Sequence, residues 1–449
     1  DDSQAQYPVV VDPLASSAAW TGESNQASAQ YGYSVSSAGD VNGDGYSDVV
    51  VGAKAYSNGE DFEGRAYLYL GSASGLSTTA SWTGESGQAY AVYGFSVSTA
   101  GDVNGDGYSD VIVGAPNYGN GETLEGRAYL YLGSAGGLST TASWTGESNQ
   151  ATAFYGISVS TAGDVNGDGY SDVVVGAYYD SNGESSEGRA YLYLGSASGL
   201  STSASWTGES DQAFANYGSS VSTTGDVNGD GYSDVVVGAT YFSNGEDEEG
   251  RAYLYLGSAS GLSTTASWTG EANQASAYYG GSVSTAGDVN GDGYSDVVVG
   301  ATGYSNGNTW EGAAFLYLGS ASGLLTTASW VGESDQGFAG YGSSVSTAGD
   351  VNGDGYSDVV VGDNGYSNGE SGEGRAYLYL GSASGLSTTA SWTGESNQAD
   401  AYYGYSVSSA GDVNGDGYSD VVVGAYYYDN GQTDEGRAYL YLGSAGGLA

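Results

Sequence analysis

The chain has 449 residues, long enough for several domains or for one large repetitive domain. It carries 53 Asp and Glu against 7 Lys and Arg, and a formal net charge of -46 repels nucleic acids and anionic membranes, so neither is expected as a partner. The sequence has no His, Cys or Met, which excludes histidine-based catalysis, His-ligated zinc and disulfides, and no apolar run reaches the roughly 18 residues of a membrane-spanning helix.

Strong acidity often indicates disorder, but hydrophobic residues make up 39% of this chain and aromatics 13%, which favours a folded protein. The excess of carboxylates therefore predicts neutralisation by a metal. The sequence begins at "DDSQAQ" without Met, as expected of a mature secreted protein whose leader has been removed, or of a trimmed chain.

A repeat of 62 residues accounts for almost the whole chain. The segment "DVNGDGYSD", which begins at Asp40, returns six more times at this constant spacing. In chain order, each unit offers four candidate strands, which in the first unit are residues 34–41, 48–53, 65–71 and 80–85. Helix-forming residues at a spacing of 3.6 are absent, and 80 glycines mark the turns.

The second and third candidate strands are apolar on both faces. Val49–Val51 is a continuous β-branched run, while Tyr67 and Tyr69 alternate with Ala66 and Leu68. A strand that is buried on both faces has this composition, and the strands of a propeller blade are covered by the blades on either side. Seven units of four strands therefore predict an all-β fold, a seven-bladed β-propeller with four antiparallel strands per blade.

The ends of the chain predict how the ring closes. The C-terminus stops after a third strand, and residues 16–23 read as a fourth strand, because Trp20 aligns with Trp82 at the same spacing of 62. We expect residues 16–23 to complete the last blade. Residues 1–15 are interpreted as an N-terminal extension, and residues 16–449 as a single propeller.

The repeated acidic segment has the spacing of a cation-binding loop. With Asp40 at position 1, oxygen ligands fall at Asn42, Asp44, the Tyr46 carbonyl and Asp48, and a glycine occupies position 6. Position 12 is Val51 rather than Glu, so the loop is not a helical EF-hand. An Asx-rich turn without metal explains any single copy, but seven intact copies favour Ca²⁺, about seven ions with one per blade. An oxygen-only ligand set selects Ca²⁺ over zinc or copper.

The predicted ligands are the same five positions in every unit: Asp40, Asn42, Asp44, Tyr46, Asp48, Asp102, Asn104, Asp106, Tyr108, Asp110, Asp164, Asn166, Asp168, Tyr170, Asp172, Asp226, Asn228, Asp230, Tyr232, Asp234, Asp288, Asn290, Asp292, Tyr294, Asp296, Asp350, Asn352, Asp354, Tyr356, Asp358, Asp412, Asn414, Asp416, Tyr418 and Asp420. Seven bound Ca²⁺ would change the formal charge from -46 to -32.

These motifs resemble the FG-GAP repeats of integrin α-subunit propellers. The "FG" appears as Tyr31-Gly32, the cation loop as residues 40–48, and the "GAP" literally as residues 114–116. The resemblance covers residues 16–449, and it implies a seven-bladed propeller with calcium on the lower rim and ligands on the upper face. Integrins carry calcium in only some blades and vary between units, whereas these units are near copies. That indicates recent amplification or consensus design.

Variation between the units is concentrated in two turns, residues 53–62 and 86–95 and their copies. In an antiparallel blade both turns lie at the end opposite the acidic loops. They are rich in Tyr beside Asn, Ser and Gly, a composition typical of binding surfaces, although tolerant loops also drift. The candidate ligand-binding residues are Tyr56, Tyr118, Tyr178, Tyr179, Tyr241, Tyr304, Trp310, Tyr366 and Tyr427.

Three recurrent features have structural interpretations. The Trp series that begins at Trp20 is expected to pack the outer strands rather than to form a sugar platform. Arg65 follows Glu63 closely, so a surface ion pair between them is expected. Glu23 and its copies either cap the turn that follows or contact a ligand.

The preferred function is a secreted or cell-surface calcium-binding module that binds a glycan or protein through the variable face, as a monomer. The alternative is a symmetric or designed repeat scaffold without a dedicated ligand. An enzyme is not expected, because catalysis needs one asymmetric constellation and most carboxylates are copied seven times.

Overall fold

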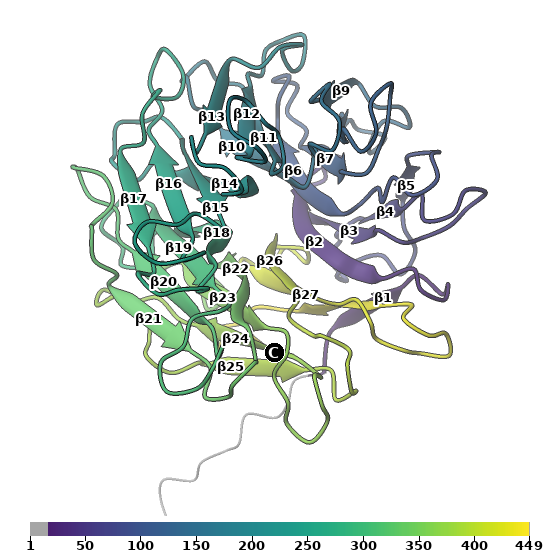
Figure 1. Ribbon diagram of the computed structural model, residues 1–449. Helices are drawn as coiled ribbons and strands as arrows, with labels where there is room; N and C mark the ends of the chain where they lie inside the picture. Colours follow the sequence, from purple (N-terminus) through teal and green to yellow (C-terminus); the bar gives the residue numbers. More distant parts are fainter. Residues whose placement is uncertain (1–16, 449) are drawn as a thin grey trace, which may run out of the picture.

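The computed structural model describes residues 17–448. Seven four-stranded antiparallel sheets stand around a central axis as the blades of a propeller (Figure 1). Residues 1–15, interpreted as an extension, lie outside the described residues. Within residues 17–448, no helix is long and apolar enough to cross a membrane.

Each blade runs outward from the axis through its strands in order. The innermost strands are β2 (Tyr31–Gly39), β6 (Ser96–Gly101), β10 (Ser158–Gly163), β14 (Tyr217–Gly225), β18 (Tyr279–Gly287), β22 (Tyr341–Gly349) and β26 (Ser406–Gly411). The second strands are β3 (Asp48–Ala53), β7 (Asp110–Ala115), β11 (Asp172–Ala177), β15 (Asp234–Ala239), β19 (Asp296–Ala301), β23 (Asp358–Asp363) and β27 (Asp420–Ala425). The third strands are β4 (Arg65–Tyr69), β8 (Arg127–Tyr131), β12 (Arg189–Tyr193), β16 (Arg251–Tyr255), β20 (Ala313–Tyr317), β24 (Arg375–Tyr379) and β28 (Arg437–Tyr441). The outer strands are β5 (Trp82–Glu85), β9 (Trp144–Glu147), β13 (Trp206–Glu209), β17 (Trp268–Glu271), β21 (Trp330–Glu333), β25 (Trp392–Glu395) and β1 (Trp20–Glu23).

The core consists of the layers between neighbouring blades. In the first blade Val49 and Val51 pack with Tyr67 and Tyr69 against the last blade. Val50 faces the other way, with Ala66 and Leu68, and packs against the second blade. Every residue of β3 is buried. The alternation of side chains along a strand thus serves two interfaces, which confirms the interpretation of strands that are apolar on both faces.

The N-terminal strand closes the ring, as the sequence predicts. β1 pairs antiparallel with β28, with Trp20 opposite Leu440 and Glu23 opposite Arg437. The indole of Trp20 packs edge-on against Tyr69 of the first blade at 4.8 Å between ring centroids, and its Nε1 donates a 3.1 Å hydrogen bond to the Ser77 carbonyl. The Trp side chain therefore joins two blades, which agrees with a packing role.

Close approach between blades explains one repeated glycine. A Cβ at Gly52 would overlap the carbonyl oxygen of Gly94 in the next blade. We expect Gly52→Ala to lower the stability of the protein by about 1–3 kcal/mol, the usual cost of overpacking a core. The measurement is denaturant unfolding followed by circular dichroism. Gly136→Ser is the matched control, because the equivalent residue of the first blade is Ser74. Equal midpoints for both variants would contradict this packing.

Candidate cation loops and the pocket at the opposite end

The acidic loop of residues 40–48 joins β2 to β3, and side-chain oxygens hold it in shape. Oδ1 of Asp40 accepts hydrogen bonds from the Gly43 and Asp44 amides at 2.7 and 3.1 Å, and Oδ2 accepts one from Gly45 at 2.8 Å. Asn42 Oδ1 accepts from the Asp44 amide at 2.9 Å. The copies in the other six blades show this same pattern to within about 0.1 Å, so each loop is a compact turn.

Asp48 closes the loop from inside the protein. Its side chain is fully buried, and its two oxygens accept hydrogen bonds from the Val41 and Gly71 amides at 2.9 and 2.8 Å. Burial raises the pKa of Asp48 to about 7, while these two hydrogen bonds oppose the rise. Asp48 therefore ties the acidic loop to the turn that follows β4, a link that the sequence did not reveal.

Neighbouring acidic loops are joined around the ring. The Ser47 amide donates a 2.9 Å hydrogen bond to the carbonyl of Asp412 in the preceding blade, and the same bond recurs at each of the seven junctions. A Cβ at Gly43 would lie 2.7 Å from the ring of Tyr108, so glycine at this position makes room for the next blade's tyrosine. The seven loops form one continuous band at one end of the propeller, the acidic-loop end.

The donor set of each loop fits a hard divalent cation. Carboxylate, amide and carbonyl oxygens are the ligands that Ca²⁺ takes, and a carboxylate that accepts backbone hydrogen bonds keeps further lone pairs. Within residues 17–448, however, no three acidic side chains converge closely enough to form a metal site. The hydrogen bonds above are those of an Asx-rich turn, so the support for a cation is the repeated donor set.

The two variable turns of each blade meet at the other end, here called the variable end. In the first blade the Tyr90 amide donates a 2.7 Å hydrogen bond to the Asp61 carbonyl, and the Val92 amide donates to that of Phe62 at 3.2 Å. The turn of residues 86–95 thus rests on the turn of residues 54–64. Antiparallel pairing places both at the end of the blade opposite the acidic loop.

Four of the predicted ligand residues have structural contacts. Tyr56, Tyr118 and Tyr366 lie half-buried under the guanidinium of the Arg that begins the third strand of the same blade, 3.9–4.0 Å from Cζ to ring centroid. Tyr304 packs edge-on against Phe315, 5.5 Å between centroids. Each of these rings therefore supports its own blade.

The remaining predicted ligand residues divide between a pocket and the outer rim. Tyr178 and Tyr241 line the central pocket described below. Tyr179 packs on Tyr178, and Tyr427 packs against Tyr426, with 4.2 Å between ring centroids in both pairs. Trp310 is exposed on the rim beside Phe338. The structure thus brings only Tyr178 and Tyr241 together in a concave site.

The expected ion pair between Arg65 and Glu63 is wrong. Arg65 forms its ion pair with Glu85, which lies directly opposite on β5. Four further blades repeat this cross-strand pair, and the last blade forms it between Arg437 and Glu23, whereas the fifth blade carries Ala313 in place of Arg. Sequence proximity misled here, because Glu63 precedes the strand and is buried, where it accepts a hydrogen bond from the Asn58 amide, whereas Arg65 and Glu85 are direct cross-strand partners. Glu23 and its copies therefore have a structural partner.

A cavity of about 590 Å³ opens on the axis between the innermost strands. Tyr33, Ser34 and Val35 line it near the start of β2, whereas the acidic loop follows the end of that strand, so the cavity belongs to the variable end. Its mouth is formed by one variable position, which every blade except the fifth contributes to the lining. In chain order this position is Tyr33, Phe95, Ile157, Ser219, Gly281, Ser343 and Tyr405. The variation of the residue after each "YG" motif is visible in the sequence, but this position was not among the predicted ligand-binding residues.

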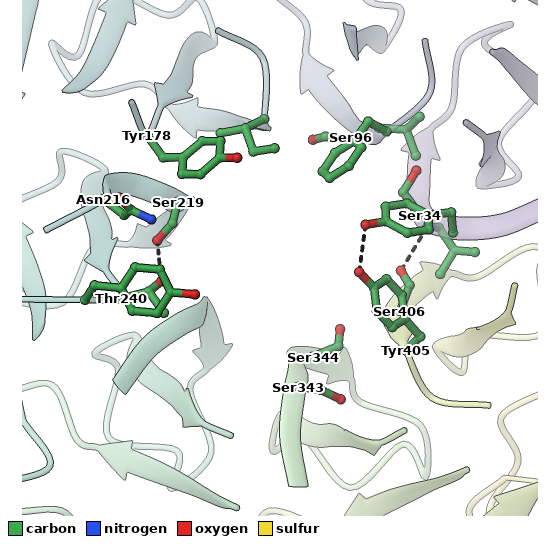
Figure 2. A pocket seen from close by; sticks show the side chains of 16 residues that line it. Ser34, Ser96, Tyr178, Asn216, Ser219, Thr240, Ser343, Ser344, Tyr405 and Ser406 are labelled. Atoms are coloured by element: carbon green, nitrogen blue, oxygen red, sulfur yellow. Dashed lines mark hydrogen bonds between the residues drawn. The ribbon is translucent and has the colours of Figure 1, made fainter. Parts of the chain in front are cut away.

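The two sides of the cavity differ in chemistry. Tyr178, Asn216, Ser219 and Thr240 stand on one side, and Tyr405 faces them across the opening beside Ser34, Ser96 and Ser406 (Figure 2). The Tyr405 hydroxyl donates a 2.7 Å hydrogen bond to that of Tyr33. Tyr33, Phe95 and Tyr405 therefore form an aromatic wall, with serine hydroxyls among the rings, opposite the hydroxyl and amide groups of the other side.

Lys54, the one lysine of the chain, lies behind the aromatic wall. Its Nζ is 3.4 Å from the centroid of the Tyr33 ring and 5.2 Å from that of Phe95. Burial lowers the pKa of Lys54 to about 8. Within residues 17–448 it forms no ion pair with an acidic side chain, so a cation–π contact supports its charge.

Comparison with known proteins gives consistent matches. The chain is 37% identical to integrin alpha-V of Gallus gallus over 221 residues, which is 47% of this chain and 20% of that protein. It is 33% identical to integrin alpha-PS2 of Drosophila melanogaster over 224 residues, 46% of this chain and 15% of the other. The matches thus span at most about a fifth of the length of these relatives.

The model of the FG-GAP repeat matches in every blade, over residues 31–69, 93–131, 155–193, 217–255, 279–317, 341–379 and 403–441. Each match begins at a buried tyrosine at the start of the innermost strand or just before it, includes the acidic loop and ends with the third strand. Together the matches cover more than half of the chain. The chain therefore belongs to the FG-GAP repeat family, in an integrin α-like seven-bladed propeller.

Proposed function

We propose that the chain is a calcium-binding, secreted or cell-surface propeller that acts as a non-enzymatic binding or adhesion module through its variable end. One observation carries this proposal. The seven blades are nearly identical at the acidic-loop end, while the pocket mouth at the variable end differs in nearly every blade. A ligand in this pocket contacts six of the seven blades at once, so differences between blades can serve its recognition.

The chemistry of the pocket supports binding rather than catalysis. None of its lining residues is an Asp, Glu, Lys or Arg, and paired carboxylates are what glycoside hydrolysis requires. The integrin relatives support a location outside the cell, where Ca²⁺ is available to sites of millimolar to submillimolar affinity. The alternative remains a symmetric or designed scaffold without a dedicated ligand, and the experiment below separates the two.

The absence of native Cys allows the protein to be attached to a sensor through one chosen face. Ser74→Cys places the tether in an exposed turn at the acidic-loop end, and Glu60→Cys places it in an exposed turn at the variable end. Both sensors are screened against glycan and extracellular-protein panels in Ca²⁺. We expect ligands to bind the Ser74-tethered protein and to give a much lower maximum signal on the Glu60-tethered protein.

Equal signals from both tethers would contradict the use of the variable end. No ligand on either sensor, with circular dichroism showing intact folds, would favour the scaffold.

A further inference from the structure

We infer that the central pocket of the variable end binds a neutral saccharide, with one sugar ring held between the aromatic wall and the hydroxyl–amide wall. This inference rests on the proposed function, and it adds the chemical class of the ligand. The volume of about 590 Å³ lies within the range of about 300–1,000 Å³ that small-molecule sites occupy.

Asn216 is the polar group that indicates a ligand. Its side chain lines the pocket although the residue is only 4% exposed, and Figure 2 shows its amide nitrogen turned toward the cavity. Among the described residues 17–448 its side chain has no hydrogen-bond partner. Its amide atoms are not among the fully buried unpartnered ones, so they keep accessible surface, and an amide can both donate to and accept from sugar hydroxyls.

Asn216 is also specific to its blade. The equivalent residues are Gln30, Val92, Phe154, Tyr278, Gly340 and Tyr402, and all seven positions have positive φ. The backbone at this position therefore accepts other side chains, so its left-handed conformation does not by itself explain the Asn.

Further polar groups line the cavity on both sides of the opening. Ser219 and Thr240 share a 2.6 Å hydrogen bond between their hydroxyls, and Ser219 also reaches the Gly238 carbonyl at 3.4 Å, so the pair offers a ligand mainly acceptor lone pairs. The Tyr178 hydroxyl points into the opening (Figure 2) and has no hydrogen-bond partner within the described residues. Ser344 accepts the Val407 amide at 3.1 Å, which leaves its hydroxyl proton to donate.

The opposite wall suits the apolar face of a sugar ring. Phe95 is apolar, and the Tyr405 hydroxyl donates to that of Tyr33, so the three rings line this side with aromatic carbon and one free hydroxyl proton. A pyranose has one face of C–H groups and a periphery of hydroxyls. These two features match the two walls of the pocket, because aromatic rings bury apolar surface while the convergent polar groups fix orientation.

Charge argues for a neutral ligand. A chain with net charge -46 repels anions. A cationic ligand would find no carboxylate in the lining, and the Tyr33 ring already contacts the ammonium of Lys54. A neutral hydroxyl-rich ring is not repelled by the acidic chain and needs no carboxylate in the lining.

The repeat supplies substitutions that the fold already accepts at equivalent positions. Ser219→Tyr combined with Ser343→Tyr fills the pocket with the residue that Tyr33 and Tyr405 provide at the same ring position. Asn216→Gly removes the free amide and places there the residue found at Gly340, where φ is 74°. Phe338→Ser is the matched control outside the pocket, since the equivalent position carries Ser276 and the Phe338 side chain is 68% exposed.

The probes are an array of neutral, N-acetylated and acidic oligosaccharides, followed by titration of glucose, galactose, mannose and N-acetylglucosamine by calorimetry or saturation-transfer NMR. We expect a neutral saccharide to bind the native protein and the Phe338→Ser control equally. The double Tyr variant should lose this binding. Asn216→Gly should weaken it by about tenfold, the effect of one lost hydrogen bond.

Three results would overturn the inference. Neutral-saccharide binding that survives the double Tyr variant would place the site elsewhere and leave the proposed function intact. Binding of only acidic glycans or proteins in the pocket would refute the ligand class but not the function. No neutral saccharide bound at millimolar concentration would refute the inference, and no ligand of any kind in the tethering experiment as well would refute both.

Discussion

Chelation of calcium should lower the stability of this protein by up to about 10 kcal/mol. For a site with a dissociation constant of ~10⁻⁴ M, about 1 mM Ca²⁺ stabilises the folded state by roughly 1.4 kcal/mol, and seven such sites act together. That sum is comparable with the whole stability of an ordinary domain. The loops are joined around the ring through the Ser47 and Asp412 backbones, so a cation in one loop also steadies its neighbour. Thermal unfolding followed by circular dichroism, with and without EDTA, measures the effect.

Two controls separate site binding from charge screening. Monovalent salt at equal ionic strength should recover little of the loss, because screening is weak between charges only a few ångströms apart. Asp44→Asn in one blade should reduce the calorimetric stoichiometry from about seven ions to about six and cost only about one site's share, roughly 1.4 kcal/mol. A melting temperature unchanged after complete chelation would refute the calcium assignment.

Asp363→Ala is the substitution that we expect to stabilise the protein most, by about 2–4 kcal/mol at neutral pH. Asp363 is fully buried on β23, where the other six blades carry Ala, as at Ala53. Ser334 donates a 2.8 Å hydrogen bond to its Oδ2, but Oδ1 has no partner within residues 17–448. Burial raises the pKa of Asp363 to about 7, against an ordinary value of 3.8. The ionised carboxylate is therefore held at a cost that alanine avoids.

The pH dependence gives this prediction a definite sign. The folded state binds the Asp363 proton more tightly than the unfolded state does. Protonation of Asp363 therefore stabilises the folded state fully below pH 3.8, and this stabilisation is lost as the pH rises through 7. The advantage of the Ala variant should grow over this interval and stay constant above it. Denaturant unfolding at several pH values measures the difference.

Asp363→Asn provides the control, because it keeps the shape of the side chain without its charge and should recover much of the gain above pH 7. A native protein as stable as the Ala variant at pH 8 would show that the buried carboxylate costs nothing.

The sequence alone was sufficient for the architecture. A spacing of 62 without insertions gave the number of blades, and strands such as Val49–Val51, apolar on both faces, required cover on both sides. The unpaired fourth-strand sequence at Trp20 predicted the closure with β28, which the pairing of Trp20 with Leu440 confirms. These features are local and repeated seven times, so periodicity and composition report them directly.

Only the tertiary structure decided which residues meet. Asp48 caps the turn after β4, and Arg65 pairs across the sheet with Glu85 rather than with nearby Glu63. Tyr31, whose copies begin every family match, is fully buried rather than a surface motif. Such contacts depend on register and strand twist, which the order of residues along one strand does not specify.

The pocket shows most clearly the difference between what the sequence predicts and what only the tertiary structure decides. Tyr33, Phe95 and Ser219 are separated by 62, 124 and 186 residues, and each follows its own "YG" motif without any local sign of function. They become one site because ring closure brings the same position of every blade to the axis. The sequence by itself determined the blades, their number and their closure. The folded ring decided which variable residues face a common cavity, because that cavity exists only where all seven innermost strands converge.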